Sequence, residues 1–154
     1  VNYTMPPGIS RVLDPSQPQL RQDNEQAMSL QITDLEPNEA RAVYNKTNLD
    51  LRRYEHVQMF IHAENIVEAA STVEDGDMSV FIRLGTDYRS NYYEYEIPLT
   101  ITPEGYYDGN TSNGCKAVWP EENMLDIDFT KFTELKRRRN IGSNTNPEIT
   151  KNKI

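Results

Sequence analysis

Two glutamates on one predicted strand, Glu94 and Glu96, come closest to a catalytic pair in this sequence. Glycoside hydrolysis uses two carboxyl groups that lie about 5 to 9.5 Å apart across a cleft. Residues i and i+2 of a strand share a face about 7 Å apart, so this spacing is met, as it is by any such pair. We therefore interpret Glu94 and Glu96 as surface charges rather than as an acid and a nucleophile.

Metal ligation is the second chemistry that the sequence suggests. His56 and His62 lie in or beside one predicted strand and share its face, with Glu64 nearby. A zinc site needs three or four protein ligands, and no distant third ligand accompanies this pair. The acidic stretch 74–77 lacks the spacing of an EF-hand loop, and the single cysteine, Cys115, fits no metal motif. We expect no metal and no cofactor.

The sequence contains no nucleophile elbow, P-loop, zinc-protease motif or dinucleotide fingerprint. No nucleophile has a matched base, so we expect a protein that is not an enzyme. The net charge is −8, from 24 acidic and 16 basic residues. This excess of acid argues against a nucleic-acid partner, which would need a basic surface, and against docking on anionic lipid.

Aromatic and charged side chains gather on the outer face of three predicted strands, 57–64, 78–85 and 92–100. If these strands are neighbours, rings for stacking on a sugar lie beside paired charges, as in a carbohydrate-binding module. The other interpretation, which we favour, is cross-strand pairing of Arg83 with Glu94 or Glu96 on a face covered by protein. The cluster also includes Glu64, and its other members form the predicted interaction face: Phe60, His62, Phe81, Arg83, Tyr92, Glu94 and Glu96.

Alternation of apolar and polar residues predicts the strands that position this face. A further strand is predicted at 28–33, and a last one between 118 and 129. Residues 102–117 contain three glycines and a proline and predict a long loop. A short helix is predicted to begin at Asp128 or Thr130 and to end in the basic run 136–139. The inward-facing residues of the three central strands are Val57, Met59, Ile61, Ala63, Met78, Val80, Ile82, Leu84, Tyr93, Tyr95, Ile97 and Leu99.

Short alternating strands with little helix indicate an all-β fold. We predict an antiparallel β-sandwich, jelly-roll-like, with long loops and a short C-terminal helix. The length of 154 residues suits one domain. The predicted organisation is an extended, proline-rich segment at 1–25, the sandwich at 26–139 and a linker or tail at 140–154. We expect no transmembrane helix, because no apolar run reaches about 18 residues. A start on valine and no signal peptide suggest an excised piece.

Several blocks in one order carry a resemblance that covers roughly residues 3–140. They include "PPGISR" near the start, "LDLRRYEHVQMFIHAE" at 49–64, "GDMSVFIRLGTDYRSNYYEYEIPL" at 76–99 and "VWPEENMLDI" at 118–127. Together they resemble the SprA/Sov family, the very large outer-membrane translocon proteins of the type IX secretion system in Bacteroidetes. "FTELKRRRN" at 132–140 and the closing "NKI" are also similar to this family.

The resemblance implies a fragment of a giant β-barrel protein that conducts folded cargo across the outer membrane and, in gliding bacteria, serves motility. This piece lacks the long lipid-facing strands of a barrel wall, so we expect a non-catalytic insertion or cap domain on the periplasmic or cell-surface side. The implied partners are other parts of the translocon, its shuttle and plug proteins, and exported cargo. No nucleic acid is expected, and membrane contact is expected only through the missing barrel.

Overall fold

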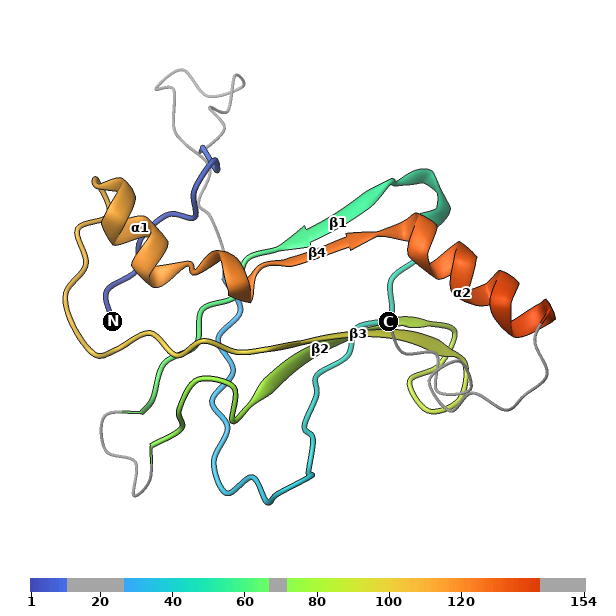
Figure 1. Ribbon diagram of the computed structural model, residues 1–154, viewed down its shortest axis with the longest axis horizontal. Coiled ribbons are helices and arrows are strands. Elements are labelled where there is room, and N and C mark those ends of the chain that lie inside the picture. The colour runs from blue at the N-terminus through green and yellow to red at the C-terminus, as the bar shows by residue number, and fades with distance from the viewer. Residues whose placement is uncertain (11–26, 67–71, 142–154) are drawn as a thin grey trace. The chain divides into compact units, whose positions relative to one another are not determined.

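The computed structural model describes residues 1–10, 27–66 and 72–141 of the chain (Figure 1). The chain divides into two compact units, one made of Val1–Pro7 with Leu51–Ile154, the other of Gly8–Asp50. Most of the predicted extended segment at 1–25 and most of the predicted tail at 140–154 lie outside the described residues.

An antiparallel hairpin forms where two neighbouring strands were predicted (Figure 1). Strand β2 (Ser79–Gly85) pairs with β3 (Tyr92–Pro98). The register places Arg83 opposite Glu94, as the cross-strand interpretation requires. Gly85 lies at the turn end of β2, where a Cβ atom would come within 2.1 Å of the Asn91 carbonyl oxygen, so only glycine fits there.

A second antiparallel pair joins strand β1 (His56–Met59) to β4 (Leu125–Asp128), and the two ribbons run side by side in Figure 1. The prediction that 57–64 extends one sheet with the hairpin is therefore wrong. The strand ends at Met59 and its partner is β4, whose apolar side chains are the most buried of the described residues. Alternation predicts that a segment is a strand, but it does not specify which strand pairs with it.

The helix α1 (Ser112–Val118) replaces part of the loop predicted at 102–117. Thr111 is its N-cap, because its hydroxyl oxygen accepts a hydrogen bond from the Gly114 amide at 3.1 Å. Gly114 is buried, and a Cβ atom there would lie 2.1 Å from the Asp108 carbonyl oxygen. The glycine that suggested a loop is thus required by a tight approach at the start of a helix. The short 3-10 turns η1 (Leu51–Arg53) and η2 (Glu121–Asn123) complete the element order.

The predicted C-terminal helix is confirmed as α2 (Phe129–Ile141). Asp128 precedes it, and its Oδ1 accepts a hydrogen bond from the Thr130 amide at 2.8 Å, so Asp128 is the capping residue. Toward the C-terminal end of α2, Glu134 accepts hydrogen bonds from the guanidinium groups of Arg137 and Arg138. These bonds lower the pKa of Glu134 to about 2. Within the described ranges, neither α2 nor any other helix has the length and apolarity to cross a bilayer.

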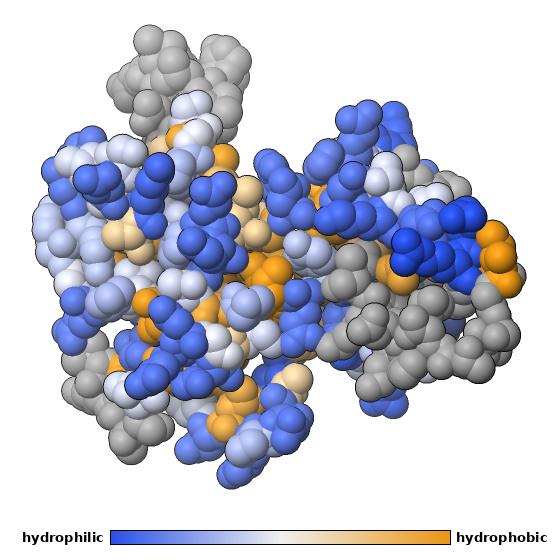
Figure 2. Space-filling view, viewed as in Figure 1, coloured by the Kyte–Doolittle hydropathy of each residue, from blue (hydrophilic) through white to orange (hydrophobic). Residues whose placement is uncertain are grey.

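The most buried apolar side chains come from α1, β4 and α2 rather than from the hairpin. They are Val118, Leu125, Ile127 and Phe132, each less than one tenth exposed. The hairpin residues Val80, Ile82 and Leu84, predicted as a buried core, are only half-buried. A two-stranded sheet gives each face few neighbours, so its inward side chains keep contact with solvent. Apolar residues therefore reach the surface among polar ones, as Figure 2 shows.

Small antiparallel sheets with two helices make the described chain β-rich, which confirms the broad class. The hairpin's inward side faces α2, because the Tyr93 and Phe132 rings lie 5.1 Å apart between centroids. Asn123, fully buried, donates its Nδ2 hydrogen to the Thr100 carbonyl at 2.8 Å and accepts from the Thr100 amide at 2.7 Å. These contacts hold the end of the hairpin against η2. The sandwich itself stays a prediction.

The described part of the second unit has no helix or strand, so the strand predicted at 28–33 is wrong in this structure. Met28, Leu30 and Ile32 are 74%, 53% and 37% exposed. Alternation predicts a strand only if a partner strand is present to accept its hydrogen bonds. None of the residues that the structure describes supplies one here. The guanidinium of Arg41 instead donates to the carbonyls of Thr33 and Asp34, at 2.7 and 2.9 Å.

The turn between β2 and β3 is organised by Asp87. Its carboxylate accepts hydrogen bonds from the amides of Arg89, Ser90 and Asn91 and from the Asn91 side chain, and these hold its pKa well below the usual range. A depressed pKa in the folded state contributes stability above the ordinary value, near 3.8, and that contribution is lost as the pH falls toward the folded pKa.

We therefore expect Asp87→Asn to lower the unfolding midpoint of the chain at pH 6, and this difference from the wild type to shrink steadily between pH 4 and pH 2. Urea titrations across that range measure it. Asp108→Asn is the comparison, because the Asp108 carboxylate, in another turn, also accepts hydrogen bonds from a nearby backbone amide and side chain, both of Asn110. A wild-type-to-Asp87→Asn difference that stays constant with pH would show that the carboxylate charge has no part in holding the turn.

Candidate functional site

Arg83 is the centre of a polar and aromatic cluster on the outward side of the hairpin. Its Nε donates to Glu94 Oε2 at 2.5 Å, and its Nη1 donates to the Tyr88 carbonyl at 3.0 Å. The guanidinium carbon lies 4.3 Å from the Tyr92 ring centroid and 5.0 Å from that of Phe81. Such cation–π contacts contribute about 0.5–2 kcal/mol each. The arginine is thereby held in one position between two rings and a carboxylate.

The two glutamates of this face differ in burial and in partner. The Glu94 side chain is 3% exposed, whereas that of Arg83 is 34% exposed. A buried carboxylate is stable only when a cation and hydrogen bonds compensate its charge, and Arg83 supplies the cation and one such bond. Glu96 accepts a hydrogen bond from the Ser79 hydroxyl. Each carboxylate is thus engaged by the hairpin itself, an arrangement that suits a structural role rather than a pair of catalytic acids.

The predicted interaction face divides into two groups in the structure. Five of its residues share the outward side of the hairpin, and we call them the hairpin face: Phe81, Arg83, Tyr92, Glu94 and Glu96. Phe60 and His62 do not join them, because they follow β1 and pack edge-on against Trp119, at 6.3 and 5.9 Å between ring centroids. Their placement on the same face as the hairpin was wrong, and the reason is the pairing of β1 with β4.

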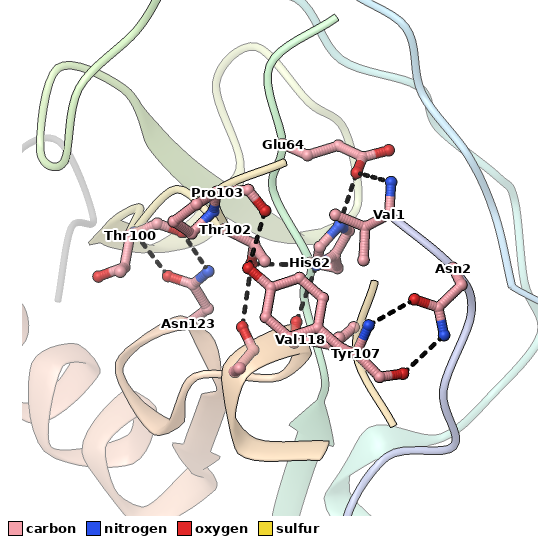
Figure 3. A network of polar contacts seen from close by, with 11 residues as sticks. Val1, Asn2, His62, Glu64, Thr100, Thr102, Pro103, Tyr107, Val118 and Asn123 are labelled. Atoms are coloured by element: carbon pink, nitrogen blue, oxygen red, sulfur yellow. Dashed lines mark hydrogen bonds and ion pairs between the residues drawn. The ribbon is translucent and has the colours of Figure 1, made fainter. Parts of the chain in front are cut away.

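Polar contacts around His62 tie distant parts of the first unit together (Figure 3). His62 Nδ1 lies 2.8 Å from the Val118 carbonyl oxygen, so this nitrogen carries a proton and donates it. His62 Nε2 lies 3.4 Å from Glu64 Oε2. The backbone nitrogen of Val1 lies 2.7 Å from the same oxygen. His62 is therefore in contact with polar groups on both of its ring nitrogens.

The N-terminal residues are anchored beside this network. Trp119 Nε1 donates to the Thr4 carbonyl at 2.9 Å. The Asn2 side chain donates to the Tyr107 carbonyl at 2.7 Å and accepts from the Tyr107 amide at 2.8 Å, as Figure 3 shows. Sequence reasoning missed these anchors. The only tryptophan of the chain was the one signal that could have pointed to them.

The described residues contain no group of three or more histidine, cysteine, aspartate or glutamate side chains placed to hold a metal ion. His56 lies near Asp126, with Nδ1 3.2 Å from Oδ1, and away from His62, which follows the end of β1. In the acidic stretch 74–77, Asp75 accepts from the Ile101 amide and Asp77 from the Glu74 amide. These carboxylates shape backbone turns.

These features define a class, a β-rich chain with a hairpin on which Arg83, Glu94 and Glu96 bond to side chains and backbone of the hairpin itself. The model of a family of motility-related and secretion proteins, SprA_N, matches residues 1–152. The chain therefore belongs to the SprA_N family, in agreement with the resemblance found in the sequence. Comparison with curated proteins finds no match.

Proposed function

We propose that the chain is a non-catalytic domain of an outer-membrane translocon of the type IX secretion system, which serves protein export and, in gliding bacteria, motility. The observation that carries this proposal is the family match over 1–152. On this proposal the domain is an insertion or cap at the outer membrane, on its periplasmic or cell-surface side. Its partners are other parts of the translocon, shuttle and plug proteins, and exported cargo.

The hairpin face is the surface through which we propose that the domain contacts protein. Aromatic residues and arginine are enriched at the centres of protein interfaces, and this face combines Tyr92, Phe81 and a partly exposed Arg83. The arginine is already fixed by Glu94, so little side-chain entropy is lost when a partner covers it. The net charge of the Arg83–Glu94 pair is zero, which suits burial under an apolar or neutral partner surface.

A carbohydrate-binding module is the alternative, and the same geometry weighs against it. Stacking on a sugar needs an open ring face, and the Arg83 guanidinium already covers one face of the Tyr92 ring at 4.3 Å. A glycan array with the wild-type chain and Tyr92→Ala separates the two proposals. Sugar binding that disappears on this substitution would replace the protein-contact proposal by the carbohydrate one.

The β-sandwich is part of the same proposal. The Tyr93–Phe132 contact and the two hydrogen bonds between Asn123 and Thr100 place the hairpin against the elements that carry β4 and α2. Both sheets have only two strands in the described residues. A sandwich follows if further strands of the full protein add to these sheets.

Secretion in cells tests the proposed role. In a gliding bacterium that carries the full-length protein, we expect Tyr92→Ala, which keeps the Arg83–Glu94 pair, to lower cargo secretion and colony spreading at unchanged protein abundance. Arg89→Met is the matched control, because Arg89 lies over the Tyr88 ring at the turn, at 5.6 Å, outside the hairpin face. Normal secretion in the Tyr92→Ala variant at normal abundance would contradict a contact role for this face.

A further inference from the structure

A short segment of the first unit, residues 2–6, lies against residues that are 105 to 115 positions further along the chain. It belongs to no helix or strand. The Asn2 side chain donates to the Tyr107 carbonyl at 2.7 Å and accepts from the Tyr107 amide at 2.8 Å. Trp119 Nε1 donates to the Thr4 carbonyl at 2.9 Å. Each of these bonds joins a side chain to a main-chain group, and main-chain bonds of this kind are typical of peptide recognition.

Burial alternates along the segment, as it does in an extended peptide bound to a surface. Thr4 is 3% exposed and Pro6 is buried, whereas Tyr3 is 53% exposed and Met5 is only half-buried. Thr4 lies against Gly109, where a Cβ atom would come within 3.1 Å of Thr4 Cγ2, so a side chain at position 109 would crowd the threonine. We call three residues of this surface the seat: Tyr107, Gly109 and Trp119.

The segment is held less firmly than the core of the unit. Its buried side chains, Thr4 and Pro6, are small, and the Thr4 hydroxyl is buried without a hydrogen-bond partner among the residues that the structure describes. An unpaired buried hydroxyl opposes binding, because its hydration is lost and not replaced. Just beyond the segment, Gly8 is exposed and has a φ of 79°, which leaves the chain free to turn there. Segments with few buried apolar contacts open locally while the core stays folded.

We propose that residues 2–6 are a reversible strap, a peptide of this chain that binds to the seat and leaves it. The seat recognises a neutral peptide, since residues 2–6 carry no charge, with asparagine, a small residue and proline at alternate positions. An amide side chain is required at the first of these, because it both donates to and accepts from the Tyr107 main chain. The proposal depends neither on the hairpin face nor on the translocon role.

A designed disulfide tests whether the strap lies on the seat. A Cβ atom at position 109 would lie 3.2 Å from Thr4 Cβ, close to the spacing of about 3.5–4.5 Å in disulfides. In the purified full-length protein, we expect Thr4→Cys with Gly109→Cys to form a disulfide under mild oxidation. Cys115→Ser is the background, because Cys115 Sγ lies 3.1 Å from the Gly109 carbonyl oxygen. Tyr3→Cys with Gly109→Cys is the control pair and should not crosslink, because the Tyr3 side chain is exposed.

Competition by a free peptide tests whether the strap leaves the seat. The peptide VNYTMPP, residues 1–7, is added at millimolar concentration, which is comparable to the effective concentration of a tethered segment. We expect it to slow formation of the 4–109 disulfide about threefold. Maleimide labelling of Thr4→Cys alone, followed by mass spectrometry of the peptide that contains it, should become faster by a similar factor. An Asn2→Ala peptide should have no effect, and a Thr4→Val peptide should compete more strongly, because valine has no hydroxyl to leave unpaired.

Labelling of Tyr3→Cys is the control for this competition and should not respond to any of the peptides. Absence of the 4–109 disulfide would overturn the proposal, because the strap would then not lie on the seat. A disulfide that forms at a rate no peptide changes would also overturn it, since the strap would be a fixed part of the fold. Equal competition by the Asn2→Ala peptide would do the same, because the seat would not recognise the segment.

Discussion

Ile127→Ala is expected to lower the free energy of unfolding by about 2–5 kcal/mol, the range for large-to-small changes at fully buried sites. Ile127 in β4 is 0% exposed and lies opposite Val57 in the register with β1. Its neighbour Leu125, two residues earlier on the same side of the strand, is 1% exposed. Removing three carbons there leaves a cavity between the two-stranded sheet and the elements that cover it, because close-packed surroundings relax only in part.

Urea denaturation of the chain followed by tryptophan fluorescence measures this change, since Trp119 belongs to the same unit. Ile141→Ala makes the same substitution at a side chain that is 72% exposed. It should change stability by less than about 0.5 kcal/mol. Equal effects of the two substitutions would show that the Ile127 side chain does not lie in the core.

Asn123→Leu is expected to cost about 2–4 kcal/mol, although leucine has a similar volume and is more apolar. Asn123 is 0% exposed, and its amide group bonds to both the N–H and the C=O of Thr100. Leucine would remove both bonds and leave these two backbone groups without that partner, at about 1–3 kcal/mol each. This expectation reverses the usual rule that an apolar residue stabilises a buried position.

The matched substitution is Asn113→Leu, at an exposed position of α1, which should be within about 0.5 kcal/mol of the wild type. Asn123→Asp is informative as well, because it keeps an acceptor for the Thr100 amide and loses the donor to the Thr100 carbonyl. We expect it to be destabilising too. If Asn123→Leu is as stable as the wild type, the two hydrogen bonds between Asn123 and Thr100 do not stabilise the fold.

Local features of the fold could be predicted from the sequence because they depend on neighbouring residues. The hairpin follows from the alternation on both sides of a polar turn, and the register confirms the expected Arg83–Glu94 pair. The start of α2 follows from Asp128, whose side chain caps the first turn. In each case one short window of sequence contains both the pattern and the residues that satisfy it.

Long-range partners were the features that the sequence could not supply. The pairing of β1 with β4 joins residues about seventy positions apart, and nothing in "HVQM" specifies "LDID" as its partner. The same difficulty placed Phe60 and His62 on the hairpin face, whereas they contact Trp119. The helix α1 was missed because Gly114 was interpreted only as a helix breaker. Because glycine has no Cβ atom, the backbone at this position can lie close to the Asp108 carbonyl oxygen.

Photo-crosslinking from position 92 of the full-length protein in living cells shows whether the hairpin face contacts protein. A photoreactive amino acid replaces Tyr92, and the same amino acid at Arg89, in the turn beyond this face, provides the comparison. We expect discrete crosslinks to a polypeptide from position 92, and we expect them to weaken when Arg83→Met disturbs the face. Crosslinks of equal yield from both positions, or none from position 92 in a secreting cell, would contradict a protein contact through this face.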